Sequence, residues 1–445
     1  MAAVSDAPLD YEFVVLNNSV PNAWALPGGK IAVNRGLLTE LNNEAELAAV
    51  LGHEVVHAAA RHGAQAMTRG TLLQGALAVG AIASQDNDFA DFIVGASQLG
   101  AQLISQRYGR EAELQSDEYG IRYMIAAGYD PRAAISLQET FVRLSAGQNQ
   151  GWLDGLFSSH PPSEERVDNN RALVNELLLE LAGRDLEIGA LRYEQVMAFV
   201  HENAEAYALF DEAERAIADN DLDIALLNLD TAIGMVPDEA RFTGLKADIY
   251  LYQDNYREAV AVYDAAISKD ANYFDYYLGR GVTHARLGNR RQARADLEQS
   301  SQLLPTAIAM NELGKLTLLE GNRNQAKDYF SQAAQAQGQV GSEASISFMR
   351  LDIEDNPGNY ISVSTLVDNN GRIFVRALNN SGLEINDLTV EVAAVIGGEI
   401  STRTRRLASL VSGNYSDINS GMRFPEGQAW SSDQLFARVL SARVN

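Results

Sequence analysis

Apolar and polar positions near the start of the chain predict a short sheet followed by a helix. The apolar runs 24–26 and 31–33 are separated by Pro27-Gly28-Gly29, a strong turn signal, so we expect a β-hairpin there. Residues 44–51 form a proline-free run with acidic residues at its start, which is typical of a helix that continues through residue 57. Gly52 is the one poor helix former in this run, and its missing side chain would let another element approach.

The middle of the chain repeats itself every 33 or 34 residues. Alanines stand at four equivalent positions, and small residues recur twelve before and seven after each of them. The alanines are Ala225, Ala259, Ala293 and Ala326, and the small residues are Ala213, Ala247, Gly281, Gly314, Ala232, Ala266, Ser300 and Ala333. This is the tetratricopeptide (TPR) pattern, in which small residues let the two helices of each unit cross closely. We therefore predict an α-helical array of about four repeats over residues 196–345.

Repeat arrays of this kind bind extended peptides or other proteins along a concave face. The positions expected to line that groove are mixed in character: Tyr207, Phe210, Tyr252, Arg286, Asn311 and Lys315. They include no cluster of Lys and Asn that would grip a terminal carboxylate, so no particular ligand is predicted.

From about Asn356 the pattern changes to short strand-like runs. They cover 360–364, 372–378, 388–395 and 435–440, and Asn- and Gly-rich turn signals punctuate them. About seven short strands in this region predict an all-β, immunoglobulin-like sandwich over residues 355–445.

Composition narrows the classes of function. The 445-residue chain has a formal net charge of −24, which argues against binding to nucleic acid or to anionic lipid surfaces. It contains no cysteine, so disulfides and thiol catalysis are excluded. No uncharged apolar run reaches the length of a transmembrane helix. The nearest, residues 71–84, is expected to be a buried helix on the active-site side or a mobile lid, with a membrane-touching patch as a minor alternative.

One short motif carries most of the predicted chemistry. His53-Glu54-Val55-Val56-His57 matches H-E-x-x-H, and on a helix His53 and His57 direct their imidazoles to one point. Glu54 lies close enough to reach a water bound to a metal there. Two surface histidines could stand four apart by coincidence, but the chain has only six histidines. We predict one Zn²⁺ per chain.

A catalytic zinc needs a third protein ligand and one open position. Glu113 and Asp117 stand four apart on a predicted helix, so one could bind the metal while the other orients a ligand histidine. Spacing alone does not choose between Glu113 and Glu111, and a solvated acidic helix face is the alternative interpretation.

These motifs occur in the order found in a known family. The H-E-x-x-H helix, the later Glu113-x-x-x-Asp117, the upstream segment 22–33 and the downstream segment 159–166 carry the likeness. They resemble the gluzincin metallopeptidases that include the CAAX prenyl protease and the heat-shock protease HtpX, and within them the soluble periplasmic BepA (YfgC)-like branch. The resemblance implies a multidomain chain that begins with an α+β zincin-type metallopeptidase domain over residues 1–195.

The same resemblance implies roles for individual residues. His53, His57 and Glu113 would be the zinc ligands, Glu54 the general base, and Asp117 the residue behind the ligands. Ser116 departs from the family pattern, which usually has a small apolar residue there.

His160 and Arg166 are catalytic candidates, because a further donor should stabilise the oxyanion formed during peptide hydrolysis. The resemblance implies another role for His160: in BepA-like proteins the histidine of this loop can occupy the open metal position and hold the enzyme inactive. A rigid turn with a surface histidine is the third interpretation, since Pro161 and Pro162 follow. We expect His160 near the metal and favour the inhibitory role.

Asn22, Ala23 and Trp24 are candidates for an edge strand that binds an extended substrate by backbone pairing. The alternative is that Trp24 is a core residue.

Two functions are consistent with these features. One is a zinc endopeptidase that acts on misfolded or assembly-stalled envelope proteins, with the repeats selecting the substrate or contacting the outer-membrane assembly machinery. The other is a chaperone or assembly factor for outer-membrane proteins with a mostly closed, weakly active zinc site. The intact Glu54 favours the first. The resemblance implies a periplasmic protein, so we expect that a signal peptide is absent from this sequence.

Overall fold

The computed structural model describes residues 1–26, 28–63, 108–145, 160, 163–181, 183–336 and 338–444. The segment 71–84 and the prolines Pro27, Pro161 and Pro162, on which parts of the sequence analysis depend, lie outside these residues. Contacts divide the chain into two units, Met1–Tyr252 and Gln253–Asn445. Within the described residues, no helix is long and apolar enough to cross a membrane.

The first unit begins with a three-stranded sheet in the order β1-β3-β2. Its strands are β1 (Glu12–Leu16), β2 (Ala23–Leu26) and β3 (Lys30–Asn34). β2 and β3 are antiparallel, with Ala23 opposite Val33, and this register confirms the predicted hairpin. β1 is parallel to β3 on the other side, so within the described residues β2 is an edge strand of this sheet.

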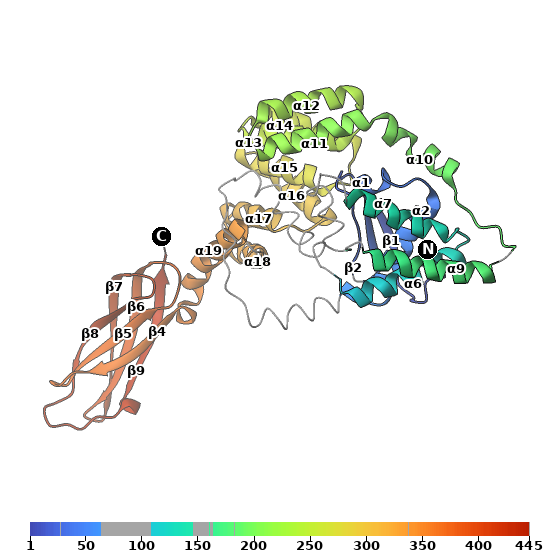
Figure 1. Cartoon of the computed structure of the whole chain (residues 1–445). Helices are drawn as coiled ribbons and strands as arrows, with labels where there is room; N and C mark the ends of the chain where they lie inside the picture. The colour runs from blue at the N-terminus through green and yellow to red at the C-terminus, as the bar shows by residue number, and fades with distance from the viewer. Residues whose placement is uncertain are drawn as a thin grey trace. The chain divides into compact units, whose positions relative to one another are not determined.

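Helices follow the sheet in the first unit (Figure 1). They are α1 (Arg35–Leu38), α2 (Glu44–Ala59), α6 (Arg110–Ala126), α7 (Arg132–Ser145), α9 (Glu164–Glu180) and α10 (Ala190–Glu202). A 3₁₀ turn, η1 (Ala2–Val4), precedes the sheet. The N-cap of α2 is Asn43, whose side chain accepts a hydrogen bond from the Glu46 backbone N–H. Leu37, Val50, Ile121 and Met124 belong to one buried cluster between these helices.

Two glycines allow α2 and α6 to pack backbone against backbone. A Cβ atom on Gly52 would lie 2.8 Å from the carbonyl oxygen of Gly120, and one on Gly120 would lie 2.9 Å from the His53 nitrogen. Real side chains cannot occupy those positions without a shift of backbone. The expectation that Gly52 lets another element approach is therefore confirmed, and that element is α6.

The TPR pattern corresponds to pairs of helices, as predicted. The first unit contains α11 (Ala204–Ala218), α12 (Leu222–Met235) and α13 (Ala240–Tyr252). The second contains α14 (Tyr256–Lys269), α15 (Phe274–Arg286), α16 (Arg290–Leu303), α17 (Ala307–Leu319), α18 (Arg323–Ala333) and α19 (Gly338–Asp355). The repeated small residues are buried because a larger neighbour fills the space beside them; a Cβ on Gly314, for example, would lie 2.6 Å from the Phe330 ring.

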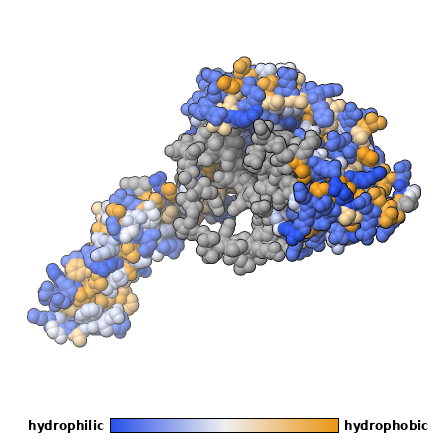
Figure 2. Space-filling view, viewed as in Figure 1, coloured by the Kyte–Doolittle hydropathy of each residue, from blue (hydrophilic) through white to orange (hydrophobic). Residues whose placement is uncertain are grey.

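The prediction of the groove-lining residues is partly wrong. Tyr207, Phe210 and Asn311 are buried, so they are packing residues within the helix pairs. Tyr207 and Phe210 belong to a buried cluster formed by α11, α12 and α13. Over much of the helical surface on the face shown in Figure 2, hydrophilic residues predominate and hydrophobic ones are scattered between them.

The second unit ends in two antiparallel three-stranded sheets around one core. One has the order β4 (Ile361–Val367), β5 (Arg372–Asn379), β8 (Tyr415–Arg423), and the other β7 (Glu399–Leu410), β6 (Ile385–Ile396), β9 (Leu435–Arg443), with 3₁₀ turns η2 (Pro357–Asn359) and η3 (Ser432–Gln434). Residues 356–444 thus hold six strands, where about seven were predicted. The end of α19 joins the two modules: Leu351 packs with Ala326 and Phe330, while Ile353 belongs to the core of the sheets.

Candidate metal centre

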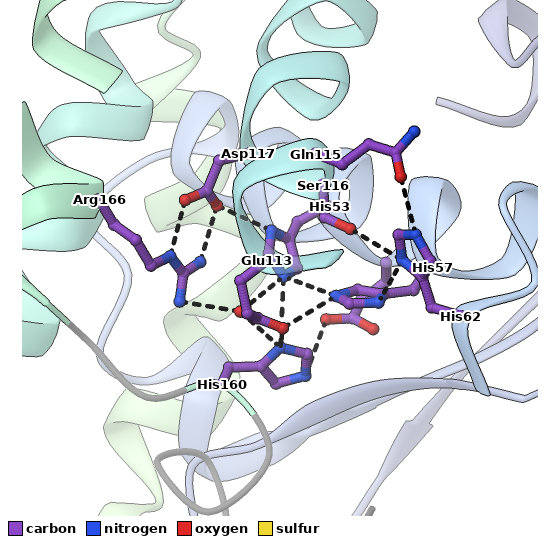
Figure 3. A network of polar contacts seen from close by, with 10 residues as sticks. His53, His57, His62, Glu113, Gln115, Ser116, Asp117, His160 and Arg166 are labelled. Atoms are coloured by element: carbon purple, nitrogen blue, oxygen red, sulfur yellow. Dashed lines mark hydrogen bonds and ion pairs between the residues drawn. The ribbon is translucent and has the colours of Figure 1, made fainter. Parts of the chain in front are cut away.

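Three side chains from two helices meet at one point in the first unit (Figure 3). The Nε2 atoms of His53 and His57, both on α2, are 3.0 Å apart. From α6, Glu113 places Oε1 3.3 Å from His57 Nε2 and Oε2 3.5 Å from His53 Nε2. Together with His160, these residues offer four ligand atoms that all lie within 4.8 Å of one another.

The choice between the two candidate glutamates is a matter of helix face. Glu113 is buried and points into the cluster, whereas Glu111 is exposed. Residues two apart on a helix do not share a face, so only one of the two can point toward α2.

The Nδ1 atom of His53 contacts a charged pair formed by Asp117 and Arg166. Asp117 Oδ1 lies 2.9 Å from His53 Nδ1, and the Arg166 guanidinium donates two hydrogen bonds of 2.7 Å to the same carboxylate. Burial alone would raise the pKa of Asp117, but the hydrogen bonds and charge of Arg166 outweigh it and lower the pKa to about 2. An ionised Asp117 accepts the Nδ1 proton of His53, which leaves His53 Nε2 free to bind an ion.

Arg166 is occupied by carboxylates on two sides. Besides Asp117, its Nη1 lies 2.9 Å from Glu113 Oε2. Arg166 is buried, and the position of Asp117 between Arg166 and His53 is visible in Figure 3. Its guanidinium is thus shared between the carboxylates of Asp117 and Glu113.

Glu54 lies beside the cluster as a buried carboxylate. Its Oε2 has no hydrogen-bond partner among the described residues, and its Oε1 lies 3.5 Å from His160 Nε2. Burial raises the pKa of Glu54, and the neighbouring imidazoles of His160 and His53 oppose that shift. A buried carboxylate oxygen without such a partner can accept a proton from a water molecule that enters the site.

His160 is also brought into the cluster. Its Nδ1 lies 3.1 Å from Glu113 Oε1 and 3.3 Å from His53 Nε2, and the residue is buried. The interpretation of His160 as a surface histidine is therefore wrong.

Two residues of the site were missed by the sequence analysis. Tyr108 stacks its ring on His57, with centroids 3.9 Å apart. His62 Nδ1 lies 3.1 Å from His57 Nδ1. No sequence signal pointed to Tyr108. His62 could have been noticed as one of only six histidines, but it stands five positions after His57 and so falls outside the helical spacing.

The candidate substrate strand lies next to a pocket beside the cluster. Asn22, Ala23 and Trp24 are all buried, and β3 is the strand with which β2 pairs among the described residues. A pocket is lined by Ala23, His53 and Glu54 together with apolar residues of α2, α6 and α7. Those apolar residues include Val50, Ile121, Met124, Leu137 and Phe141. The pocket also contains Gln138, whose Oε1 has no hydrogen-bond partner in the described part of the chain.

The donor set suits a divalent transition-metal ion. Two imidazole nitrogens and a carboxylate oxygen face one point, and the Nδ1 atoms of both histidines on α2 are engaged on the opposite side. Imidazole with carboxylate is a ligand combination found at zinc sites.

Comparisons with known proteins agree with this arrangement. Residues 1–174 match the model of peptidase family M48, and residues 247–288 match that of a TPR repeat. Mitochondrial metalloendopeptidase OMA1 of Arabidopsis thaliana is 32% identical over 158 residues, which are 36% of this chain and 30% of that protein. The beta-barrel assembly-enhancing protease of Escherichia coli (strain K12) is 25% identical over 274 residues, which are 56% of this chain and 55% of that protein.

The chain thus spans 55% or less of the length of these two relatives. Among solved structures, a thermophilic TPR protein of Thermus thermophilus is 17% identical, with a TM-score of 0.30, and the match covers 49% of this chain and 99% of that one.

Proposed function

We propose that this chain, which carries a peptidase family M48 domain over residues 1–174, is an endopeptidase that uses zinc. The observation that carries the proposal is the convergence of His53, His57 and Glu113 beside the buried carboxylate of Glu54. Three nitrogen or oxygen ligands with a further position for water or substrate are the arrangement of catalytic zinc sites. The metalloendopeptidase relatives support the same reaction class.

The ligands in this proposal are His53 Nε2, His57 Nε2 and a carboxylate oxygen of Glu113. When bound, zinc polarises the carbonyl of the scissile peptide and lowers the pKa of a water molecule. Glu54 takes the proton from the attacking water and delivers it to the leaving amine. Its Oε2 supports this role because no hydrogen bond to the described residues has to break before the proton is accepted.

Asp117 and Arg166 act through the ligands in this proposal. Asp117 keeps His53 in the tautomer that leaves Nε2 free, and Arg166 keeps Asp117 ionised and Glu113 in place. Arg166 was a candidate for stabilising the oxyanion. Its contacts with two carboxylates favour the orienting role instead.

His160 is the proposed inhibitory group. Its imidazole lies within the ligand cluster, and its Nε2 is buried without a hydrogen-bond partner among the residues that the structure describes. A neutral imidazole is a good fourth ligand for zinc and would exclude the catalytic water. The same closeness would also suit an oxyanion donor, and the two roles predict opposite effects of removing it.

The substrate is proposed to bind as an extended peptide along Ala23 and Trp24 of β2 and along Asn22, the residue before this strand. The edge position of β2 and the contact of Ala23 with the pocket support this placement. The apolar walls of the pocket favour a hydrophobic substrate side chain next to the cleaved bond. The burial of Trp24 also suits the alternative, in which it is a core residue.

The substrates are proposed to be misfolded or assembly-stalled envelope proteins in the periplasm, selected by the repeats. The support is the similarity to the beta-barrel assembly-enhancing protease, whose name refers to barrel assembly, together with the TPR match. A chaperone or assembly factor with a mostly closed zinc site is the second candidate. The observation that favours it is the position of His160 inside the cluster.

We further propose domain limits of 1–195, 196–345 and 355–445, with an immunoglobulin-like class for the last module. Two antiparallel sheets that share one core support that class.

The test is the degradation of casein by the wild type and by Glu54→Gln, with zinc measured in both. We expect the variant to lose hydrolysis by about 10²-fold or more while it keeps its zinc, because a base is removed and no ligand is. If both proteins hold zinc and neither cleaves casein, the chaperone function is favoured. If the wild type holds no zinc, the metal site is wrong.

A further inference from the structure

His62 is a buried histidine to which the proposed mechanism gives no role. It follows α2 after Arg61, whose backbone has a φ of +58°. Residues other than glycine seldom adopt this left-handed conformation, and they keep it where the surrounding structure holds it. The turn returns the His62 side chain to the last turn of α2, beside His57 (Figure 3).

Both ring nitrogens of His62 are engaged. Nδ1 lies 3.1 Å from His57 Nδ1, and Nε2 lies 3.0 Å from Oε1 of Gln115, which comes from α6. The Ser116 hydroxyl is 3.5 Å from Nδ1. Among the described residues, none of these polar partners of His62 is an acid, so a neutral ring is expected.

The direction of the protons follows from the chemistry of the groups. An amide oxygen only accepts, so the Gln115 contact requires a proton on His62 Nε2. The neutral ring then has a bare Nδ1, and the contact between the two Nδ1 atoms can be a hydrogen bond only if His57 carries the proton. His57 is left with a free lone pair on Nε2, which faces His53 and Glu113.

The opposite direction is incompatible with metal binding. If the Gln115 amide donated to His62 Nε2, His62 would donate from Nδ1, and the proton of His57 would move to Nε2. That nitrogen could then bind no ion. Both ligand histidines of α2 therefore have a partner that selects their tautomer: Asp117 for His53, and His62 for His57.

We propose that His62 is a positioning residue that keeps the proton of His57 on Nδ1 and its Nε2 free for the metal ion, and that Gln115 sets the tautomer of His62. The inference rests on the zinc site of the proposed function. In this arrangement the uncharged pair of His62 and Gln115 contacts His57, and the charged pair of Asp117 and Arg166 contacts His53.

The test measures Zn²⁺ dissociation constants of the full chain by competition with a chromogenic chelator. The variants are His62→Leu, His62→Gln and Gln115→Leu, with His201→Leu as the matched control because His201 is an exposed histidine of α10. We expect His62→Leu to weaken zinc binding by about 10- to 100-fold. His62→Gln should bind more tightly than His62→Leu, since its amide oxygen can accept the same hydrogen bond. Gln115 is exposed, so Gln115→Leu should lose less, and His201→Leu should match the wild type.

A second readout is the ring ¹⁵N spectrum of the zinc-loaded wild type, in which His57 should be protonated at Nδ1. Zinc affinity of His62→Leu equal to the wild type would overturn the inference, as would equal losses in His62→Leu and His62→Gln, which indicate mere packing. If His62→Leu does not fold, two other results together would overturn the inference. They are a zinc affinity of Gln115→Leu equal to the wild type and a ¹⁵N spectrum in which His57 has no proton on Nδ1. Failure of the wild type to bind zinc, or wild-type affinity in His57→Ala, would instead refute the metal site itself.

Discussion

Asp117 Oδ1 lies 2.9 Å from His53 Nδ1, across 64 residues of sequence. The contact joins α6 to α2 near the point where Gly52 and Gly120 bring the two helices together. Asp117 lies one helical turn after Glu113 on α6. It links the orientation of a metal-binding imidazole to the packing of two helices. The first prediction follows from it.

Asp117→Asn should lower zinc affinity by about 10- to 100-fold, because the amide is uncharged and can turn its NH₂ group toward His53. The loss is measured by chelator competition. Glu118→Gln is the matched control, since Glu118 is exposed on the same helix and pairs with Arg122. Equal zinc affinities in the two variants would contradict the role of Asp117.

Glu113→Gln should reduce zinc occupancy well below that of Glu111→Gln. The Glu113 carboxylate reaches the histidines, while Glu111 is exposed. Metal analysis after dialysis against a weak chelator measures the difference. The same occupancy in both variants would show that Glu113 is not a ligand.

His160→Ala should raise basal proteolysis, including self-cleavage, if the imidazole blocks the open metal position. If His160 stabilises the oxyanion instead, the same variant should lose about 10²- to 10³-fold in turnover with little change in zinc content. Casein hydrolysis with zinc quantification separates the two outcomes. We expect the gain of activity, and a clear loss would refute the inhibitory model.

Gly120→Ala should destabilise the first unit by about 1–3 kcal/mol, because the added methyl group meets the backbone of α2 and the helices must separate. Zinc affinity should fall as well, since the ligands come from both helices. Gly234→Ala is the control: Gly234 lies in α12 with nothing within 4 Å of its Cβ position, and alanine there should stabilise by about 0.5 kcal/mol. Denaturant unfolding of both variants measures the effect, and similar stabilities would show that the close approach of α2 and α6 is not required.

Much of this molecule could be predicted from local patterns. The helical repeat of 3.6 residues is enough to place His53 and His57 on one face, and the turn signal at Gly28-Gly29 is enough to pair β2 with β3. The spacing of small residues is likewise enough to predict the TPR helices, because each repeat packs against neighbours that are close in sequence.

Tertiary structure decided the features that depend on contacts between distant segments. Glu113 rather than Glu111 faces α2 because the glycine contact between α2 and α6 sets which face of α6 is turned inward. His62 reaches His57 through a left-handed turn at Arg61 that no helical spacing describes. Tyr207 and Phe210 are core residues because the pairing of helices turns them away from solvent. Local periodicity determines which residues share one face of a helix or strand. Only tertiary packing determines which other element that face contacts.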